Sequence, residues 1–178
     1  SFACVSYGNV AHLTLGGNRT YNLNPRTDKV AIFTNNKEFE KSLTIGEGTT
    51  LNISQGATGI SMPGPIGTVT NNGIINFQEG LNLGLKLNGS FTNNGAINII
   101  GVASKGLQIT GTFENSPSGT ITSTNVGDDA IDLRNNGKLT NQGTLNLTSR
   151  DDAIANNAGL LVGSATSVGE MINTSTGI

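Results

Sequence analysis

The sequence predicts an all-β fold, a right-handed parallel β-helix (β-solenoid) with about 22 residues per rung and an N-terminal capping segment. The first observation is a unit that occurs twice in succession, as GTVTNNGIINFQEGLNLGLKLN from Gly67 and as GSFTNNGAINIIGVASKGLQIT from Gly89. The second is that apolar and polar residues alternate in three short stretches of each unit, as in strands that bury one face. The third is that turns such as Asn-Asn-Gly separate these stretches. Three short strands in a unit of this length are typical of one rung of a stacked β-helix.

Residues 1–42 do not follow the repeat, and we predict that they form an N-terminal cap. Strand-like alternation ends at Gly16-Gly17, residues 18–29 are predicted to be a loop in which Pro25 breaks any strand, and Val30 and Ile32 lead toward the first rung. An uncovered β-helix end would expose apolar core and unpaired strand edges, and repeat proteins close their ends with atypical segments. The predicted organisation is therefore a cap over 1–42 and rungs over 43–178, open at the C-terminal end.

The repeat extends in both directions from the two central copies. Further copies start at Gly111 and Gly137, a partial copy starts at Gly169, and residues 48–62 match the last two strands of an earlier rung. Aligning the copies predicts three ladders of inward-facing residues. The first, which we call the core ladder, consists of Val69, Phe91, Phe113, Leu139 and Met171. The second pairs Leu51/Ile53, Ile75/Phe77, Ile97/Ile99, Ile121/Ser123 and Leu145/Leu147. The third consists of Ile60/Met62, Leu85/Leu87, Leu107/Ile109, Ile131/Leu133 and Ile154.

Asparagine recurs at two positions of the rung. One column follows each leading glycine by four residues and consists of Asn71, Asn93, Asn115, Asn141 and Asn173. In-register asparagines can hydrogen-bond along a stack, so this column is predicted to be a structural Asn ladder. The other column lies between inward residues and should face solvent; it consists of Asn52, Asn76, Asn98, Thr122 and Asn146. Its two interpretations are a solvated sheet surface and a polar stripe that binds sugar hydroxyls or ice.

Composition restricts the classes of function. Hydrophobic residues make up 35% and charged residues 12% of the 178 residues, which suits the narrow core of a solenoid better than a wide globular core. A net charge of −2, without a basic stripe, disfavours nucleic-acid binding. No apolar run reaches the roughly 20 residues of a membrane span, so membrane insertion is not expected.

Two pairs of aspartates are the candidates for chemistry. Asp128 and Asp129 precede Ala-Ile, and Asp151 and Asp152 precede the same dipeptide one rung later. Stacked strands lie about 5 Å apart, so the four carboxylates would repel one another unless they are neutralised. One interpretation is a set of structural salt bridges with Arg134 or Arg150, or solvated turns; the alternative is a calcium site, because Ca²⁺ accepts several carboxylate ligands. No other cofactor is expected.

The stretch VGDDAIDL around the first pair resembles the paired-aspartate motif of polygalacturonase-type glycoside hydrolases, which are right-handed β-helices. The resemblance would make Asp128 and Asp129 the acid and base of inverting hydrolysis. It covers one rung, the Gly-His-Gly and Arg-x-Lys motifs of that family are missing, and the single histidine, His12, lies in the predicted cap. We therefore predict that the protein is not an enzyme and has no catalytic residues, with a carbohydrate-active β-helix as an alternative.

A broader resemblance covers roughly residues 43–178. The segments GTVTNNGIINF, GSFTNNGAINI and GKLTNQGTLNL look like repeats in the passenger domains of autotransporters and other large secreted bacterial adhesins. The resemblance implies a secreted, extracellular β-solenoid on the bacterial cell surface that acts as adhesin or structural stalk. Its expected partners are glycans or proteins of host or matrix surfaces. A further alternative is the protomer of a filament in which the solenoid associates with itself end to end.

Overall fold

The computed structural model describes all residues except 1–4, 7–11, 34–40, 150–157, 165–166 and 175. The described residues form β-strands and no helix, and the strands lie in three sheets in which every pairing between neighbours is parallel. Successive strands of the chain visit the three sheets in turn, which is the topology of a β-solenoid. The predicted fold class is therefore confirmed. No helix in the described part of the chain could cross a membrane.

The three sheets are named here by their strands. The first sheet contains β1 (Val5–Ser6), β4 (Val30–Phe33), β7 (Gly56–Met62), β10 (Leu81–Leu87), β13 (Leu107–Ile109), β16 (Ile131–Leu133) and β19 (Leu160–Val162). The second sheet contains β2 (His12–Leu15), β5 (Ser42–Ile45), β8 (Thr68–Asn71), β11 (Ser90–Asn93), β14 (Thr112–Asn115), β17 (Gly137–Asn141) and β20 (Gly169–Asn173). The third sheet contains β3 (Thr20–Leu23), β6 (Thr50–Ile53), β9 (Ile74–Phe77), β12 (Ala96–Ile100), β15 (Thr120–Val126) and β18 (Thr144–Ser149).

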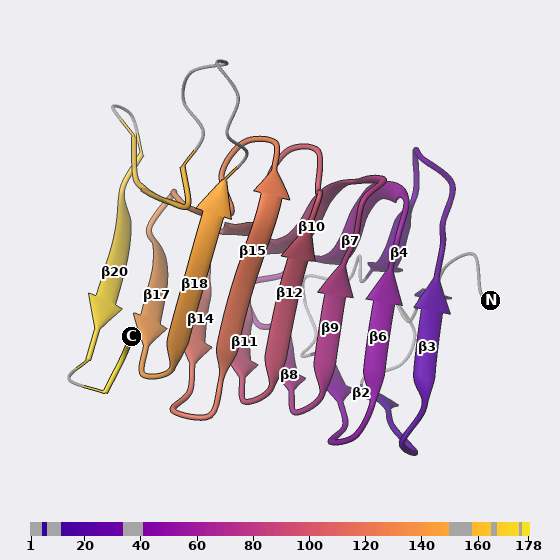
Figure 1. Ribbon diagram of the computed structural model, residues 1–178. Helices are drawn as coiled ribbons and strands as arrows, with labels where there is room; N and C mark the ends of the chain where they lie inside the picture. The colour runs from indigo at the N-terminus through magenta and orange to yellow at the C-terminus, as the bar shows by residue number, and fades with distance from the viewer. Residues whose placement is uncertain (1–4, 7–11, 34–40, 150–157, 165–166, 175) are drawn as a thin grey trace.

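The coil is right-handed and its turns differ in length. In Figure 1 the chain rises through the third sheet in front and descends through the second sheet behind as it advances from right to left. Val69, Phe91 and Phe113 are partners on adjacent turns at intervals of 22 residues. Leu139 and Met171 are also direct partners, at an interval of 32. The predicted 22 residues thus describe the central turns, and the outer turns are longer because segments are inserted between strands.

The core lies inside the coil and consists of one layer of apolar side chains for each turn. Each member of the core ladder pairs with the next in the second sheet, from Val69 to Met171. The rings of Phe91 and Phe113 stack with their centroids 4.6 Å apart and an interplanar angle of 12°. Alternation along each strand directs these residues inward, so a chain with few apolar residues still builds a continuous core.

One member of the third predicted ladder is wrong. β16 pairs with β19, which places Leu160 opposite Ile131 and Val162 opposite Leu133. These residues hold the place that the sequence alignment assigned to Ile154, which lies outside the described residues. The alignment followed the repeated Asp-Asp-Ala-Ile motif, whereas the paired strand comes several residues later in the chain.

The segment assigned to the cap contributes strands to all three sheets. β2 pairs with β5, β3 with β6, and β4 with β7, all in parallel and in register. The predicted loop over 18–29 is wrong in its first part, because β3 ends at Leu23 before Pro25 and alternation along it buries Leu23. The part of residues 1–42 that the structure describes therefore forms a turn of the solenoid, although its sequence lacks the repeat. Its role in covering the end of the core stays a prediction.

Candidate functional site

The Asn ladder runs along the corner between the second and third sheets. Asn71 Nδ2 donates to Asn93 Oδ1 at 2.8 Å, and Asn93 Nδ2 donates to Asn115 Oδ1 at 2.9 Å. The same bond continues from Asn115 to Asn141 at 2.9 Å and from Asn141 to Asn173 at 2.8 Å. The first four side chains are fully buried. All the predicted members lie in one column, and the amides of its first four members satisfy buried polar groups.

Each buried ladder asparagine also holds the turn that follows it. Asn93 Nδ2 donates to the carbonyl oxygens of Gly95 and Thr120, both at 3.2 Å. The glycine of this turn stacks closely on the preceding turn, because a Cβ on Gly95 would collide with the carbonyl oxygen of Gly73. The Asn-x-Gly signature of the repeat is therefore a corner that joins adjacent turns of the coil.

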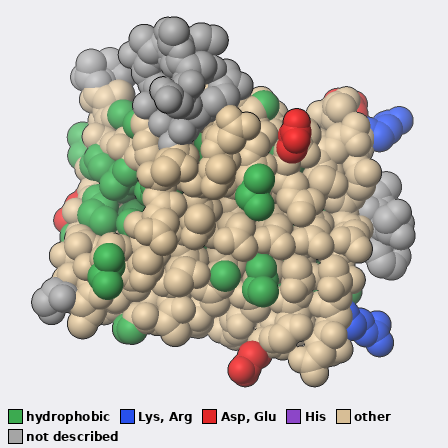
Figure 2. Space-filling model, in the orientation of Figure 1, with side chains coloured by type: hydrophobic (Ala, Val, Ile, Leu, Met, Phe, Trp, Pro, Cys, Tyr) green, Lys and Arg blue, Asp and Glu red, His purple; other side chains and the backbone are tan. Residues whose placement is uncertain are grey.

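The second asparagine column lies on the outer face of the third sheet. Asn52 donates to Asn22 at 2.9 Å, Asn76 to Asn52 at 2.7 Å, and Asn98 to Asn76 at 2.8 Å. Thr122 and Asn146 continue this column in register. Figure 2 shows that this face consists largely of uncharged side chains and backbone, with charged side chains toward its margins. Because the amides largely satisfy one another, they bind the strands together as well as facing solvent.

Asp128 and Asp129 lie in a cluster of charges beside the first sheet. Lys105 Nζ lies 2.9 Å from Asp128 Oδ2, 2.9 Å from Asp129 Oδ2 and 3.2 Å from Asp132 Oδ2. Arg134 Nε donates to Asp132 Oδ1 at 2.9 Å. The side chains of Asp129 and Asp132 are 3% and 0% exposed, so the cluster places two carboxylates out of water. Two cations compensate three carboxylates here.

The two cations hold their protons more tightly than they would in water. Burial lowers the pKa of Lys105, but its hydrogen bonds to Asp128 and Asp129 and the nearby negative charges outweigh this effect, so the pKa is raised above its ordinary value of 10.5. The hydrogen bond to Asp132 raises the pKa of the Arg134 guanidinium. Lys105 and Arg134 are therefore both charged at neutral pH.

The sequence prediction of this cluster was partly complete. It named Asp128, Asp129 and Arg134 but missed Lys105 and the buried Asp132. Asp151 and Asp152 lie outside the described residues, as does Arg150. Among the described residues no group of three or more His, Cys, Asp or Glu side chains has the arrangement of a metal site. The alignment that sets Leu107 opposite Ile131 also sets Lys105 opposite Asp129, and this register was the signal that could have found the lysine.

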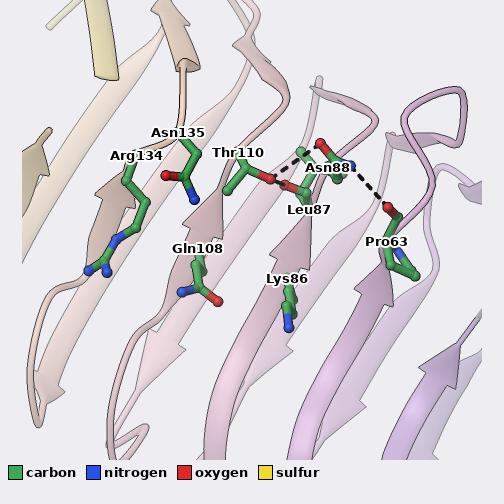
Figure 3. Close-up of a pocket in the computed structure, with 8 residues that line it drawn as sticks. All are labelled: Pro63, Lys86, Leu87, Asn88, Gln108, Thr110, Arg134 and Asn135. Carbon is green, nitrogen blue, oxygen red and sulfur yellow. Dashed lines mark hydrogen bonds between the residues drawn. The ribbon is translucent and has the colours of Figure 1, made fainter. Parts of the chain in front are cut away.

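A second polar site is an open pocket on the outer face of the first sheet, with a volume of about 340 Å³. We call it the β10–β16 pocket; its polar lining consists of Lys86, Asn88, Gln108, Thr110, Arg134 and Asn135. Lys86 and Gln108 are register partners on β10 and β13. Figure 3 shows the side chains of Lys86 on β10, Gln108 on β13 and Arg134, which follows β16, one after another across the pocket. The sequence prediction did not identify this pocket.

Comparison of the chain with families of known proteins, with curated proteins and with solved structures finds no match. The class of this protein is therefore described from its fold and its polar sites alone. It is a parallel β-solenoid with an internal Asn ladder, a compensated charge cluster and a polar pocket on one outer face.

Proposed function

We propose that this protein is a secreted, non-enzymatic β-solenoid that acts as an adhesin or structural stalk on a bacterial cell surface. The observation that carries the proposal is the unbroken stack of turns, joined by the Asn ladder inside and by asparagine bonds outside. A coil in which neighbouring turns pair through three sheets resists bending and presents long, regular outer faces. Both properties suit a protein that holds a binding surface away from a cell.

The repeat segments that resemble autotransporter passengers build these features. In GTVTNNGIINF and GSFTNNGAINI, Val69 and Phe91 belong to the core ladder and Asn71 and Asn93 to the Asn ladder. The resemblance thus rests on residues that make the stacked coil, and it supports an extracellular stalk through the architecture that such proteins share. The receptor must be recognised by other residues, on the outer faces.

The geometry of the aspartates favours a non-enzymatic role. Inverting hydrolysis needs one carboxyl group that donates a proton and another that activates water. Asp128 and Asp129 instead contact the same Lys105 ammonium at 2.9 Å, and the Asp129 side chain is 3% exposed. A carboxylate that is almost fully buried and already bound by a lysine cannot reach the glycosidic bond of a polymer. This supports structural salt bridges over the carbohydrate-active alternative.

Adhesion of coated beads tests the proposal. Beads carrying the purified chain should resist detachment by flow from surfaces coated with matrix proteins or glycans, whereas beads carrying the heat-unfolded chain should detach. Equal detachment of the two kinds of bead from every surface would exclude an adhesive role for this chain.

Electron microscopy of the purified protein tests the filament alternative. Isolated rods support a stalk or adhesin, and long filaments whose number grows with protein concentration support end-to-end assembly. Incubation with pectin-like polymers, followed by an assay for new reducing ends, tests the hydrolase alternative, and turnover that Asp129→Asn abolishes would replace our proposal.

A further inference from the structure

We infer that the β10–β16 pocket binds acidic saccharides, which are ligands that carry an anionic group among many hydroxyls. The inference rests on the proposed adhesive function and names the ligand class. The pocket has a volume of about 340 Å³ and extends across three neighbouring strands. At the spacing of paired strands, its three rows extend over roughly 10 Å.

Two cations frame the pocket. Lys86 is exposed on β10 and makes no ion pair with any residue that the structure describes. Arg134 follows β16 on the other side, with a side chain that is 33% exposed. Between them lies Gln108, whose amide has no hydrogen-bond partner among the described residues. An anionic group above Gln108 would therefore meet donors from three side chains.

The charge cluster orients Arg134 toward this ligand. Its Nε and Nη2 contact the buried Asp132, which holds the guanidinium plane in place. A guanidinium has five N–H donors, so donors remain for the pocket after this contact. The carboxylates nearest Arg134 are Asp132, Asp129 and Asp128. Asp132 and Asp129 are buried, and Lys105 contacts all three carboxylates. The carboxylates are therefore already bound by cations, and the Arg134 N–H groups that Asp132 does not use remain as donors for the pocket.

The rest of the lining suits hydroxyl groups. Asn88, Thr110 and Asn135 lie at the strand ends above the cations, as Figure 3 shows. Amides and hydroxyls offer both donors and acceptors, as vicinal sugar hydroxyls require. Asn88 and Thr110 are already fixed by hydrogen bonds, from Asn88 to the Pro63 carbonyl at 3.0 Å and from Thr110 to the Leu87 carbonyl at 3.1 Å. The polar, open lining does not suit an apolar ligand.

The test measures binding of defined oligosaccharides to the purified chain by calorimetry. Oligogalacturonate supplies carboxylates, sulfated dextran oligosaccharide supplies sulfates, and neutral dextran oligosaccharide supplies hydroxyls alone. We expect the wild type to bind at least one acidic oligosaccharide and to bind neutral dextran at least tenfold more weakly, because charge-assisted hydrogen bonds are the stronger ones. Comparison of the two acidic ligands identifies the preferred anion. Equal binding of neutral and acidic oligosaccharides, or no binding of either acidic one, would overturn the inference.

Two substitutions with matched controls locate the site. Lys86→Gln should weaken acidic binding about tenfold, whereas Lys138→Gln on β17 of the second sheet, with the same change in net charge, should leave it unchanged. Gln108→Glu should abolish binding by repulsion, whereas Gln142→Glu at the β17–β18 corner should not. Equal losses in a variant and its control would mean that the acidic ligand binds to the overall charge of the chain, against our inference. Thermal melting of each variant verifies that it is folded.

The outcome separates this inference from the proposed function. Beads that adhere through the wild type and equally through Lys86→Gln, without acidic-saccharide binding, would overturn the pocket inference and leave the adhesin proposal standing. Specific saccharide binding with no adhesion of coated beads would overturn the adhesin proposal and leave the pocket inference standing.

Discussion

Asn71 and Asn93 are joined by a hydrogen bond of 2.8 Å from the amide nitrogen of the first to the amide oxygen of the second, and both side chains are fully buried. They lie 22 residues apart in the chain and directly opposite each other on β8 and β11. The bond repeats at the next turns with nearly the same length. Adjacent turns of the coil are thus connected by a polar line inside a largely apolar interior.

Replacement of Asn93 by alanine should therefore destabilise the coil strongly. The substitution removes the buried acceptor for Asn71 and the donor for the part-buried carbonyls of Gly95 and Thr120. We expect a loss of about 2–4 kcal/mol in the free energy of unfolding, measured by urea denaturation. Asn72→Ala, at the exposed position of the same type of turn, is the control and should change it by about 0.5 kcal/mol or less. Similar losses in both variants would contradict the structural role of the ladder.

The stack of Phe91 on Phe113 should contribute a measurable coupling energy. The centroid distance of 4.6 Å and the small interplanar angle bring the two rings into direct contact. In a double-mutant cycle with Phe91→Leu and Phe113→Leu, we expect the losses to be non-additive by about 0.5–1.5 kcal/mol. Strictly additive losses in denaturant unfolding would show that the rings contribute only by their buried area.

Glycine at the corner should be required for stacking. A Cβ on Gly95 would meet the backbone carbonyl of Gly73, which cannot move without shifting the turn. Gly95→Ala should cost about 1–3 kcal/mol or more, seen as a lower thermal midpoint. The nearest atom to a Cβ on Gly16 is 3.8 Å away, so Gly16→Ala is a matched control that should leave the midpoint nearly unchanged. A tolerated Gly95→Ala would argue against such close stacking of the turns.

Lys105 should stabilise the fold through its ion pairs, and this stabilisation should be lost at alkaline pH. Its pKa is raised in the folded state, so its contribution is complete below its ordinary value of 10.5 and is lost as pH rises above that value through the folded-state pKa. Lys105→Met, which leaves three carboxylates near one arginine, should cost about 3–5 kcal/mol at pH 7. The difference in unfolding free energy between wild type and variant should shrink above pH 10.5.

Lys138→Met is the control for this substitution. Its ion pair with Glu170 is 3.7 Å long, and both side chains are substantially exposed, so we expect a loss of about 1 kcal/mol or less. A difference between wild type and Lys105→Met that stays constant up to the highest pH would contradict the ion-pair assignment.

Calcium should not stabilise the wild type through Asp128 and Asp129. Lys105 already contacts both carboxylates at 2.9 Å and supplies the compensating charge. We expect the thermal midpoint to be the same with calcium and with a chelator, whereas Lys105→Gln, which frees these carboxylates, should gain stability from calcium. A wild-type midpoint that falls on chelation would favour the calcium alternative, and Asp151 and Asp152 would then be the next ligands to replace.

The sequence by itself determined the stacked coil and its inner columns. Alternation dictates which side of a strand is buried, so Val69, Phe91 and Phe113 could be assigned to one ladder, and a fixed offset from the glycine placed Asn71 and Asn93 in another. Such information repeats from turn to turn and needs only the period to be found.

Only the tertiary structure decided the features that occur once. Lys105 and Asp129 lie opposite each other on adjacent turns, but the sequence pattern does not show that Lys105 also contacts the buried Asp132 in the same cluster. Leu160 takes the place opposite Ile131 that the sequence alignment assigned to Ile154. The residues between the repeated Asp-Asp-Ala-Ile motif and β19 shift the pairing by an amount that no local pattern records. The β10–β16 pocket likewise is lined by Lys86 and Gln108 on adjacent strands and by Arg134 from the connection after β16. Periodic contacts follow from the chain's own repeat, whereas these contacts depend on the particular path of each connection.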